Sequence, residues 1–193
     1  MVRAAPLSPD ARRASIIAAT LPLLRRYGRE VTTSQIALAA GVAEGTLFRV
    51  FPDKETLITA AVATVFDPTA DEAEAARIDP ELPLRDKLIT AIEMLQRRVS
   101  EIWQLFSMLG LGAPSEARRA PPAQMDDSRL RAALAKLFEP HRDEIRCAPE
   151  EAARFLRAIA FAGTHPRLTD PPMTPHEIVT LLLDGIRVRD EET

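Results

Sequence analysis

Four side chains that can donate hydrogen bonds to phosphate lie close together in the N-terminal part of the sequence: Thr33, Thr46, Arg49 and Lys54. Hydroxyl and cationic groups of this kind hold a protein on the backbone of a nucleic acid, and such contacts fix position without reading bases. If the fold brings the four onto one surface, that surface can bind a polyanion. Whether it does so depends on the elements that carry them.

Two short helices joined by a tight turn are predicted for residues 32–51. Thr32 and Gln35 have the spacing of a capping box, so we expect the first helix to begin there. Gly41 ends that helix after about two turns, because glycine has the backbone freedom that a tight turn needs. The second helix is expected at residues 45–51, which makes the pair a helix-turn-helix motif. Small and apolar residues fit a shared core beneath it: Ile36, Ala37, Ala40, Val42 and Leu47.

The second helix is expected to enter the major groove of DNA. Its N-terminal residues Ala43, Glu44, Gly45 and Thr46 would then face the bases. Glu44 could accept a hydrogen bond from the N4 amino group of cytosine, or its carboxylate could stay in solvent, which we favour. The alternative interpretation of the whole motif is an ordinary helical hairpin inside an enzyme or a bundle.

The stretch TTSQIALAAGVAEGTLFRVFPDKETLI resembles the DNA-binding domain of the tetracycline-repressor (TetR) family. The resemblance covers about a quarter of the chain, residues 14–61. It depends on the paired threonines, IAxxAGV, GT, an aromatic pair and K-x-x-L at the family's offsets. It implies that Thr33, Thr46 and Lys54 contact phosphate. It also implies that Ser34 and the start of the second helix face the groove.

Two positions depart from the family pattern. Phe48 occupies a DNA-facing position at which the family usually has a tyrosine whose hydroxyl binds phosphate. Val50 stands where the family often has histidine. Both donors are missing, so Arg49 is expected to contribute more of the phosphate binding.

Charge is distributed unevenly along the chain. Residues 1–52 contain seven arginines and three acidic residues, a formal charge of +4, whereas the whole chain carries −3. A basic N-terminal part on an acidic body suggests an anionic partner for the basic part. The alternative is that these arginines are merely solvated.

The sequence has no evident catalytic or metal-binding arrangement. His141, His165 and His176 are scattered, and none has the spacing of a metal motif such as HExxH. The single cysteine, Cys147, cannot form an internal disulfide, which favours a reducing, intracellular location. A signal segment and the run of about 18–20 apolar residues that spans a bilayer are both absent. We therefore expect a cytoplasmic protein that is not an enzyme, uses no cofactor or metal, and has no membrane partner.

The predicted fold is all-α with about nine helices, because apolar residues recur at helical spacing along most of the chain. Ser8 and Pro9 favour the start of the first helix, Pro22 is a point at which it could kink, and Gly28 ends it. Asp53 is expected to cap a helix reaching residue 66. Further helices are expected at 84–99, 102–111, 128–138, 149–163 and 174–189. Residues 67–83 are expected to form a loop with room for a short helical piece, and 112–127 a second loop.

We predict a helix-turn-helix DNA-binding domain at residues 1–52 and a helical ligand-binding and dimerisation domain at residues 53–193. The resemblance implies that the last two helices pair with their copies in a second subunit as a four-helix bundle. The alternative is that their apolar faces pack within one subunit. The expected interface residues are Phe155, Ile159, Ala162, Ile178, Leu182, Gly185 and Ile186.

A small-molecule pocket is expected among the helices between residues 60 and 138. Its candidate lining residues are Met94, Trp103, Phe106 and Met108, which could equally be plain core. Few charged residues fall on these apolar faces, so we expect an apolar or weakly polar ligand.

Taken together, these patterns predict a homodimeric transcriptional regulator. We expect a repressor that a small effector releases from a palindromic operator in double-stranded DNA. One alternative is a DNA-binding regulator controlled by a protein partner or by no ligand. The other is a helical enzyme, which the lack of convergent site residues disfavours.

Overall fold

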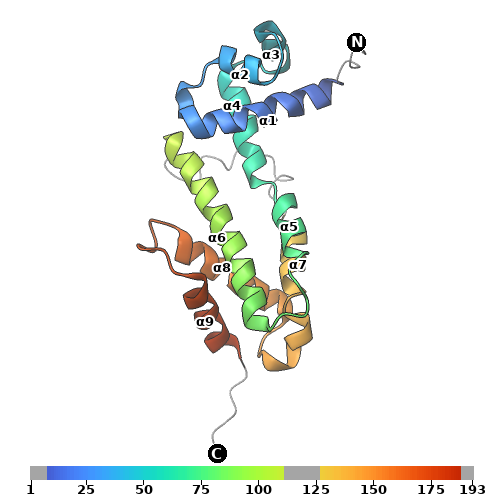
Figure 1. Cartoon of the computed structure of the whole chain (residues 1–193), viewed down its shortest axis with the longest axis vertical. Helices are drawn as coiled ribbons and strands as arrows, with labels where there is room; N and C mark the ends of the chain where they lie inside the picture. The colour runs from blue at the N-terminus through green and yellow to red at the C-terminus, as the bar shows by residue number, and fades with distance from the viewer. Residues whose placement is uncertain (1–7, 111–126, 188–193) are drawn as a thin grey trace, which may run out of the picture. The chain divides into compact units, whose positions relative to one another are not determined.

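The computed structural model describes residues 8–110 and 127–187, and this part of the chain is mainly helical (Figure 1). Its helices are α1 (Pro9–Tyr27), α2 (Thr33–Ala39), α3 (Glu44–Val50), α4 (Lys54–Ala63), α5 (Thr69–Ala75), α6 (Leu84–Met108), α7 (Ser128–Ala135), α8 (Pro149–Thr164) and α9 (Pro175–Ile186). Within these residues the β pairing consists of one isolated bridge, Ile145 to Arg187. The all-α prediction is therefore confirmed. Across the same residues, none of the helices has both the length and the apolar character needed to cross a membrane.

Helices begin where local side chains satisfy their first amides. The Ser8 hydroxyl accepts from the third residue of α1, and the Asp53 carboxylate accepts from the third residue of α4. Thr174 and Glu177 form a reciprocal capping box at the start of α9. Each unpaired amide at a helix start needs such a partner. These three starts confirm the predictions.

Some expected boundaries differ from the observed ones. Helix α6 is continuous where two helices were predicted, since its sequence contains neither glycine nor proline from Leu84 to Met108. Helix α9 ends at Ile186 rather than near residue 189. Helix α1 passes through Pro22 and ends before Gly28, and α5 is the short helical piece in the stretch expected to be mainly loop, so these two predictions are confirmed. Most of the loop expected at 112–127 lies outside the described residues.

The chain packs as two units. Of the described residues, the first unit contains 8–67 and 104–110, and the second contains 68–103 and 127–187. Helix α4 packs with α1 and belongs to the first unit. The functional division proposed from the sequence at residues 52/53 therefore does not coincide with the division in packing.

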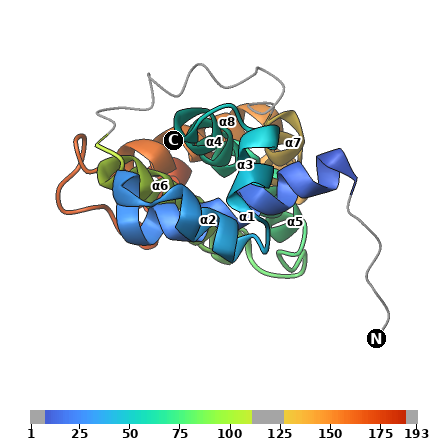
Figure 2. The ribbon, with the colours of Figure 1, turned by 90° about the horizontal axis from the view of Figure 1, so that it is seen from above.

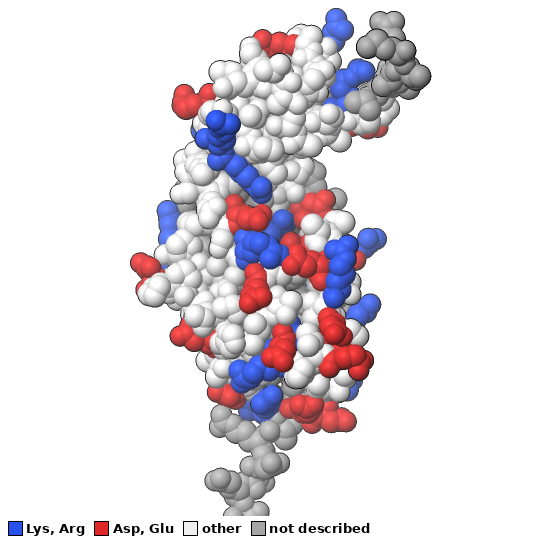
Figure 3. Space-filling model, in the orientation of Figure 1, with Lys and Arg blue, Asp and Glu red and all other residues white. Residues whose placement is uncertain are grey.

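Each unit has buried apolar side chains of its own. In the first, the largest fully buried ones include Ile16, Leu24, Ile36, Leu47, Phe51 and Leu57. In the second, one continuous core joins α5 to α9 and includes Leu88, Ile92, Phe138, Leu156 and Leu182. On the face drawn in Figure 3, acidic and basic side chains are interspersed over the second unit.

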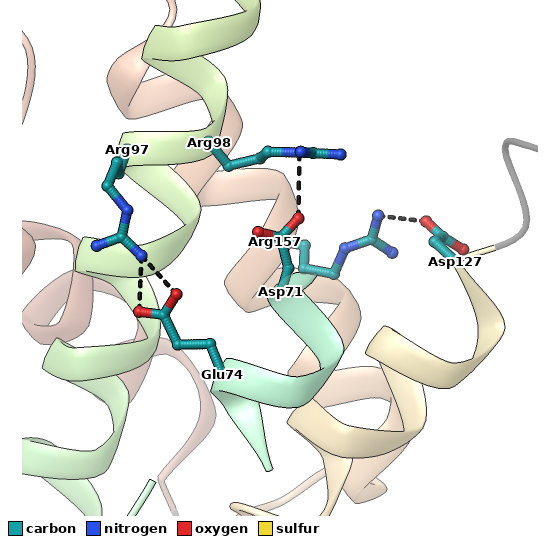
Figure 4. Close-up of polar contacts among 6 residues, drawn as sticks. All are labelled: Asp71, Glu74, Arg97, Arg98, Asp127 and Arg157. Atoms are coloured by element: carbon teal, nitrogen blue, oxygen red, sulfur yellow. Dashed lines mark hydrogen bonds and ion pairs between the residues drawn. The ribbon is translucent and has the colours of Figure 1, made fainter. Parts of the chain in front are cut away.

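Ion pairs hold α5 against α6 in the second unit (Figure 4). Arg98 Nε lies 3.1 Å from Asp71 Oδ2, and Arg97 Nη2 lies 2.6 Å from Glu74 Oε1. Burial raises the pKa of Asp71, while the charge of Arg98 opposes that shift. A third pair joins Arg157 of α8 to Asp127, directly before α7.

Candidate nucleic-acid interface

Helix α2 begins at a complete capping box. Gln35 N donates to Thr32 Oγ1 over 3.2 Å, and Thr32 N donates to Gln35 Oε1 over 2.9 Å. This arrangement satisfies two otherwise unpaired amides and fixes the first residue of the helix. The predicted capping box is confirmed.

Gly41 makes the turn between α2 and α3. Its φ of +66° lies in the left-handed region, which residues with a Cβ rarely adopt. After it, Val42 N donates to Ala37 O over 3.0 Å, which brings the chain back against α2. Ile36, Ala37 and Leu47 are buried beneath the two helices, and Ala40 and Val42 are half-buried. The predicted helix-turn-helix and its small core are both present.

The predicted DNA-contacting residues lie on α2 and α3, which pack against each other (Figure 2), directly before α3, and at the first residue of α4. Ser34, Ala43, Gly45 and Arg49 are exposed, and 47% of Phe48 is accessible. Thr33, Glu44, Thr46 and Lys54 are half-buried. Arg49 forms neither a hydrogen bond nor an ion pair with other residues in the described ranges, so its guanidinium remains available to a ligand.

A hydrogen-bonded cluster links the two helices of the motif. The Thr33 and Ser34 hydroxyls both donate to the Glu44 carboxylate, the latter over 2.8 Å. Both bonds lower the pKa of Glu44, and the bond from Thr33 has the larger effect. Sequence reasoning placed all three residues at the interface but missed that they bind one another. The periodicity of apolar residues does not indicate contacts between polar side chains on opposite sides of a turn.

Lys54 is held beside the turn that follows α1. Its Nζ donates to the Arg29 carbonyl oxygen over 2.7 Å. Arg29 in turn forms an ion pair with Glu55, in which Nη2 lies 2.6 Å from Oε2. The ammonium group of Lys54 is therefore positioned before any ligand arrives, and Arg29 is a supporting residue that the sequence did not indicate.

Residues 16–61, which span most of α1 and all of α2 and α3, match the family model described as bacterial regulatory proteins, tetR family. The N-terminal part of the chain therefore matches the TetR family of DNA-binding regulators. This match lies on the same residues that carry the motif and its exposed side chains, so the TetR-like DNA-binding domain predicted from the sequence is confirmed. No curated protein sequence gives a significant match to the chain.

Solved structures share the fold over almost the whole chain. A protein assigned to the TetR family of transcriptional regulators from Mesorhizobium loti is 18% identical; the match covers 95% of this chain and 100% of that one, with a TM-score of 0.64. A TetR-family transcriptional regulator from Streptomyces coelicolor is 23% identical; the match covers 93% of this chain and 80% of that one, with a TM-score of 0.54. The superantigen PfiT is 17% identical, with a TM-score of 0.58 covering 95% and 100%. Likeness at this level of identity establishes the TetR fold alone.

The four residues predicted to line a pocket have different surroundings. Met94 and Phe106 are fully buried core residues, which was the alternative interpretation. The Trp103 ring packs against the tilted ring of His165 with centroids 4.3 Å apart, and Met108 is 54% exposed. Met94 and Trp103 belong to the second unit, whereas Phe106 and Met108 belong to the first. The cavity found in the second unit has other lining residues.

The predicted dimer-interface residues divide into two groups. Phe155, Ala162 and Gly185 are exposed, and Ile159 is half-buried. Ile178, Leu182 and Ile186 are buried in the core of their own unit, so the prediction is wrong for these three. A side chain that the chain itself covers cannot form part of a surface that a second subunit covers.

The histidines and the cysteine do not converge on a site. His141 pairs with Glu144, His165 lies between Trp103 and Phe161, and His176 is exposed. Burial raises the pKa of the Cys147 thiol, and Glu151 adds to this shift. Among the residues that the structure describes, no group of three His, Cys, Asp or Glu could hold a metal ion.

Proposed function

We propose that this protein is a homodimeric repressor that binds a palindromic operator with α2 and α3 of each subunit and is released by a small effector. The observation that carries the proposal is the outer surface of α2 and α3 within residues 16–61. There Arg49 is exposed without a partner, and Thr46 and Lys54 are accessible at its edge. As a regulator of transcription it would act in the cytoplasm, where bacterial DNA is found.

A dimer is supported by an exposed apolar face on the last two helices. On α8, Phe155, Ala158 and Ala162 follow one another at helical spacing and are exposed. On α9, Leu181 is 56% exposed, and a Cβ added at Gly185 would meet no atom within 4 Å. Apolar side chains beside small residues suit close approach of helices from a second subunit, and two copies supply the two half-sites of a palindrome.

Release by an effector is supported by a cavity in the second unit, of about 480 Å³. A regulator controlled only by a protein partner, or by no ligand, needs no such space. Effector binding can shift operator affinity only if the effector binds the DNA-bound and free states with different affinities. The same family assignment and the dispersed histidines support a regulator rather than an enzyme.

The decisive experiment measures how salt affects DNA binding. Operator fragments are selected from a genomic pool, and the Kd of the purified protein is then measured from 50 to 200 mM salt. Each phosphate contact contributes about −0.9 to the slope of log K against log salt concentration. Arg49→Ala should lower operator affinity and reduce that slope by about one per subunit, since it removes one phosphate contact.

Arg77→Ala is the matched control, because Arg77 is an exposed arginine in the second unit with no described partner. It should leave both quantities unchanged. An operator affinity that does not depend on salt, or an Arg49→Ala slope equal to that of the wild type, would refute the proposed docking surface.

A further inference from the structure

The cavity in the second unit combines apolar walls with charged side chains. It lies among α5, α6 and α7, and its volume of about 480 Å³ is within the range of about 300–1,000 Å³ typical of small-molecule sites. Ala75, Ile78 and Leu137 supply apolar wall. Lys87, Arg129, Lys136 and Glu72 supply the charges. The lining thus carries three cations and one carboxylate.

Lys87 is the unusual member of this lining. It projects from the first turns of α6 and only 3% of it is exposed to solvent. Within the described part of the chain its ammonium group forms no hydrogen bond and no ion pair. Most of the side chain is covered, but its ammonium nitrogen is not one of the fully buried atoms without a partner, so it keeps contact with solvent in the cavity that it lines. An anion inside the cavity would replace that solvent and pair with the charge.

The other charged residues of the lining do not neutralise the charge of Lys87. Glu72 makes no ion pair with Lys87 in the described structure, although both line the cavity. Arg129 and Lys136 are exposed, which places them where the cavity meets solvent. The lining therefore has one buried cation, two cations at the surface and a formal excess of positive charge.

We propose that this cavity binds a small organic anion, a carboxylate with an apolar body, whose carboxylate pairs with Lys87 Nζ. Its hydrocarbon part would contact Ala75, Ile78 and Leu137. A small inorganic anion would leave these apolar walls uncovered, and a neutral ligand would leave Lys87 unpaired. This ligand class replaces the apolar or weakly polar effector expected from the sequence. The role of the anion as effector rests on the function proposed above, whereas its binding does not.

Calorimetric titration of the purified full-length chain, without DNA, tests the site. The probes are two matched pairs, octanoate with octanamide and 1-naphthoate with 1-naphthamide, together with inorganic phosphate. At least one carboxylate should bind wild-type protein about ten- to a hundredfold more tightly than its amide, as expected for a buried charged hydrogen bond. Lys87→Met should abolish that preference. Lys136→Met should change the Kd by less than about threefold, because a charge pair exposed to solvent contributes little.

Ala133→Leu provides a second variant that keeps Lys87. Ala133 lines the cavity and packs against the core, so added methyl groups there reduce the space for the ligand. It should weaken carboxylate binding as well. The proposal is overturned if neither carboxylate binds at millimolar concentration, if an amide binds as tightly as its acid, or if phosphate binds as tightly as both carboxylates. Unchanged binding in Lys87→Met or in Ala133→Leu overturns it too.

Addition of the binding carboxylate to the operator complex separates the two proposals. Release of DNA supports the role of the anion as effector. Binding without release refutes that role and leaves the anion site in place. Failure of the ligand-free protein to bind any selected operator refutes the proposed function instead, and the titrations without DNA still decide the site.

Discussion

Replacing Glu44 by glutamine removes one negative charge from the surface of α2 and α3 while keeping the size of the side chain. The carboxylate accepts hydrogen bonds from Thr33 and Ser34, so it links α2 to α3 within the free protein. If that link is its main role, Glu44 does not read a base, and its charge only repels DNA phosphates. The Glu44→Gln variant should then bind DNA more tightly than the wild type.

The size of the effect follows from the charge that is lost. Two unit charges in water roughly 4–8 Å apart interact with an energy equivalent to a two- to sixfold change in Kd. We therefore expect about this gain for each recognition surface at low salt. It should shrink as salt rises, since charges further apart than about 8–10 Å are screened at physiological ionic strength. The gain should be equal for operator and for unrelated DNA, because repulsion between charges does not depend on sequence.

Fluorescence anisotropy with a selected operator and a scrambled duplex, both at pH 7, measures this effect. The two hydroxyl bonds lower the pKa of Glu44 below its ordinary 4.5, so the wild-type carboxylate is ionised throughout. The pKa of Glu44 is lower in the folded protein than in the unfolded chain. The stability that these two bonds contribute is therefore complete above pH 4.5 and is lost only as the pH falls through the folded-state pKa.

Glu30→Gln is the control, because Glu30 is an exposed glutamate of the same unit outside α2 and α3. An equal gain in that variant would show that net charge, and not position, is responsible. Weaker operator binding by Glu44→Gln, with unrelated DNA unaffected, would refute the reasoning and assign Glu44 to a cytosine.

Two further predictions use matched residues of the chain. Gly28 has φ +56° and ψ −137°, and a Cβ there would lie 2.7 Å from the Met108 carbonyl oxygen, whereas Gly41 has φ +66° and open space. Gly41→Ala should therefore cost about 1–2 kcal/mol of unfolding free energy and Gly28→Ala clearly more, as measured by chemical denaturation; equal costs would contradict the close approach. For the dimer, Leu181→Glu should give monomers in light scattering after gel filtration, because it buries a charge against the second subunit. Leu168→Glu, which changes a 63% exposed leucine of the connector before α9, should stay dimeric, and a dimeric Leu181→Glu would exclude α9 from the interface.

Local signals predicted the local part of the fold. Ser8, Thr32, Asp53 and Thr174 each begin a helix as expected, because a cap depends on residues three positions apart. Gly41 was also recognised from its immediate neighbours. The positions at which helices end, and whether one helix continues into the next, were less predictable. Nothing in the apolar pattern alone distinguished one long α6 from two shorter helices.

The sequence did not predict which contacts the helices of the C-terminal half make. Helix α9 is apolar on most of its circumference, so its periodicity could not tell which residues the unit's own core covers and which remain for a second subunit. The core takes Ile178, Leu182 and Ile186 and leaves Leu181 and Gly185 exposed. The Glu44 cluster had no signal either, because Glu44 lies ten or more positions from Thr33 and Ser34, on the next helix.

The sequence position of Lys87 already indicates that this lysine lies on the buried face of a helix. It follows Leu84 by three positions and precedes Ala91 and Met94 by four and seven, so it occupies the buried face of α6. A lysine at such a position interrupts an apolar stripe, so its ammonium group needs a polar space into which it can extend. The small number of charged residues on the apolar faces of the predicted pocket helices suggested an apolar or weakly polar ligand, because Lys87 was not recognised as lying on such a face. The position of this one charge, on the face turned to the core, points instead to an anion.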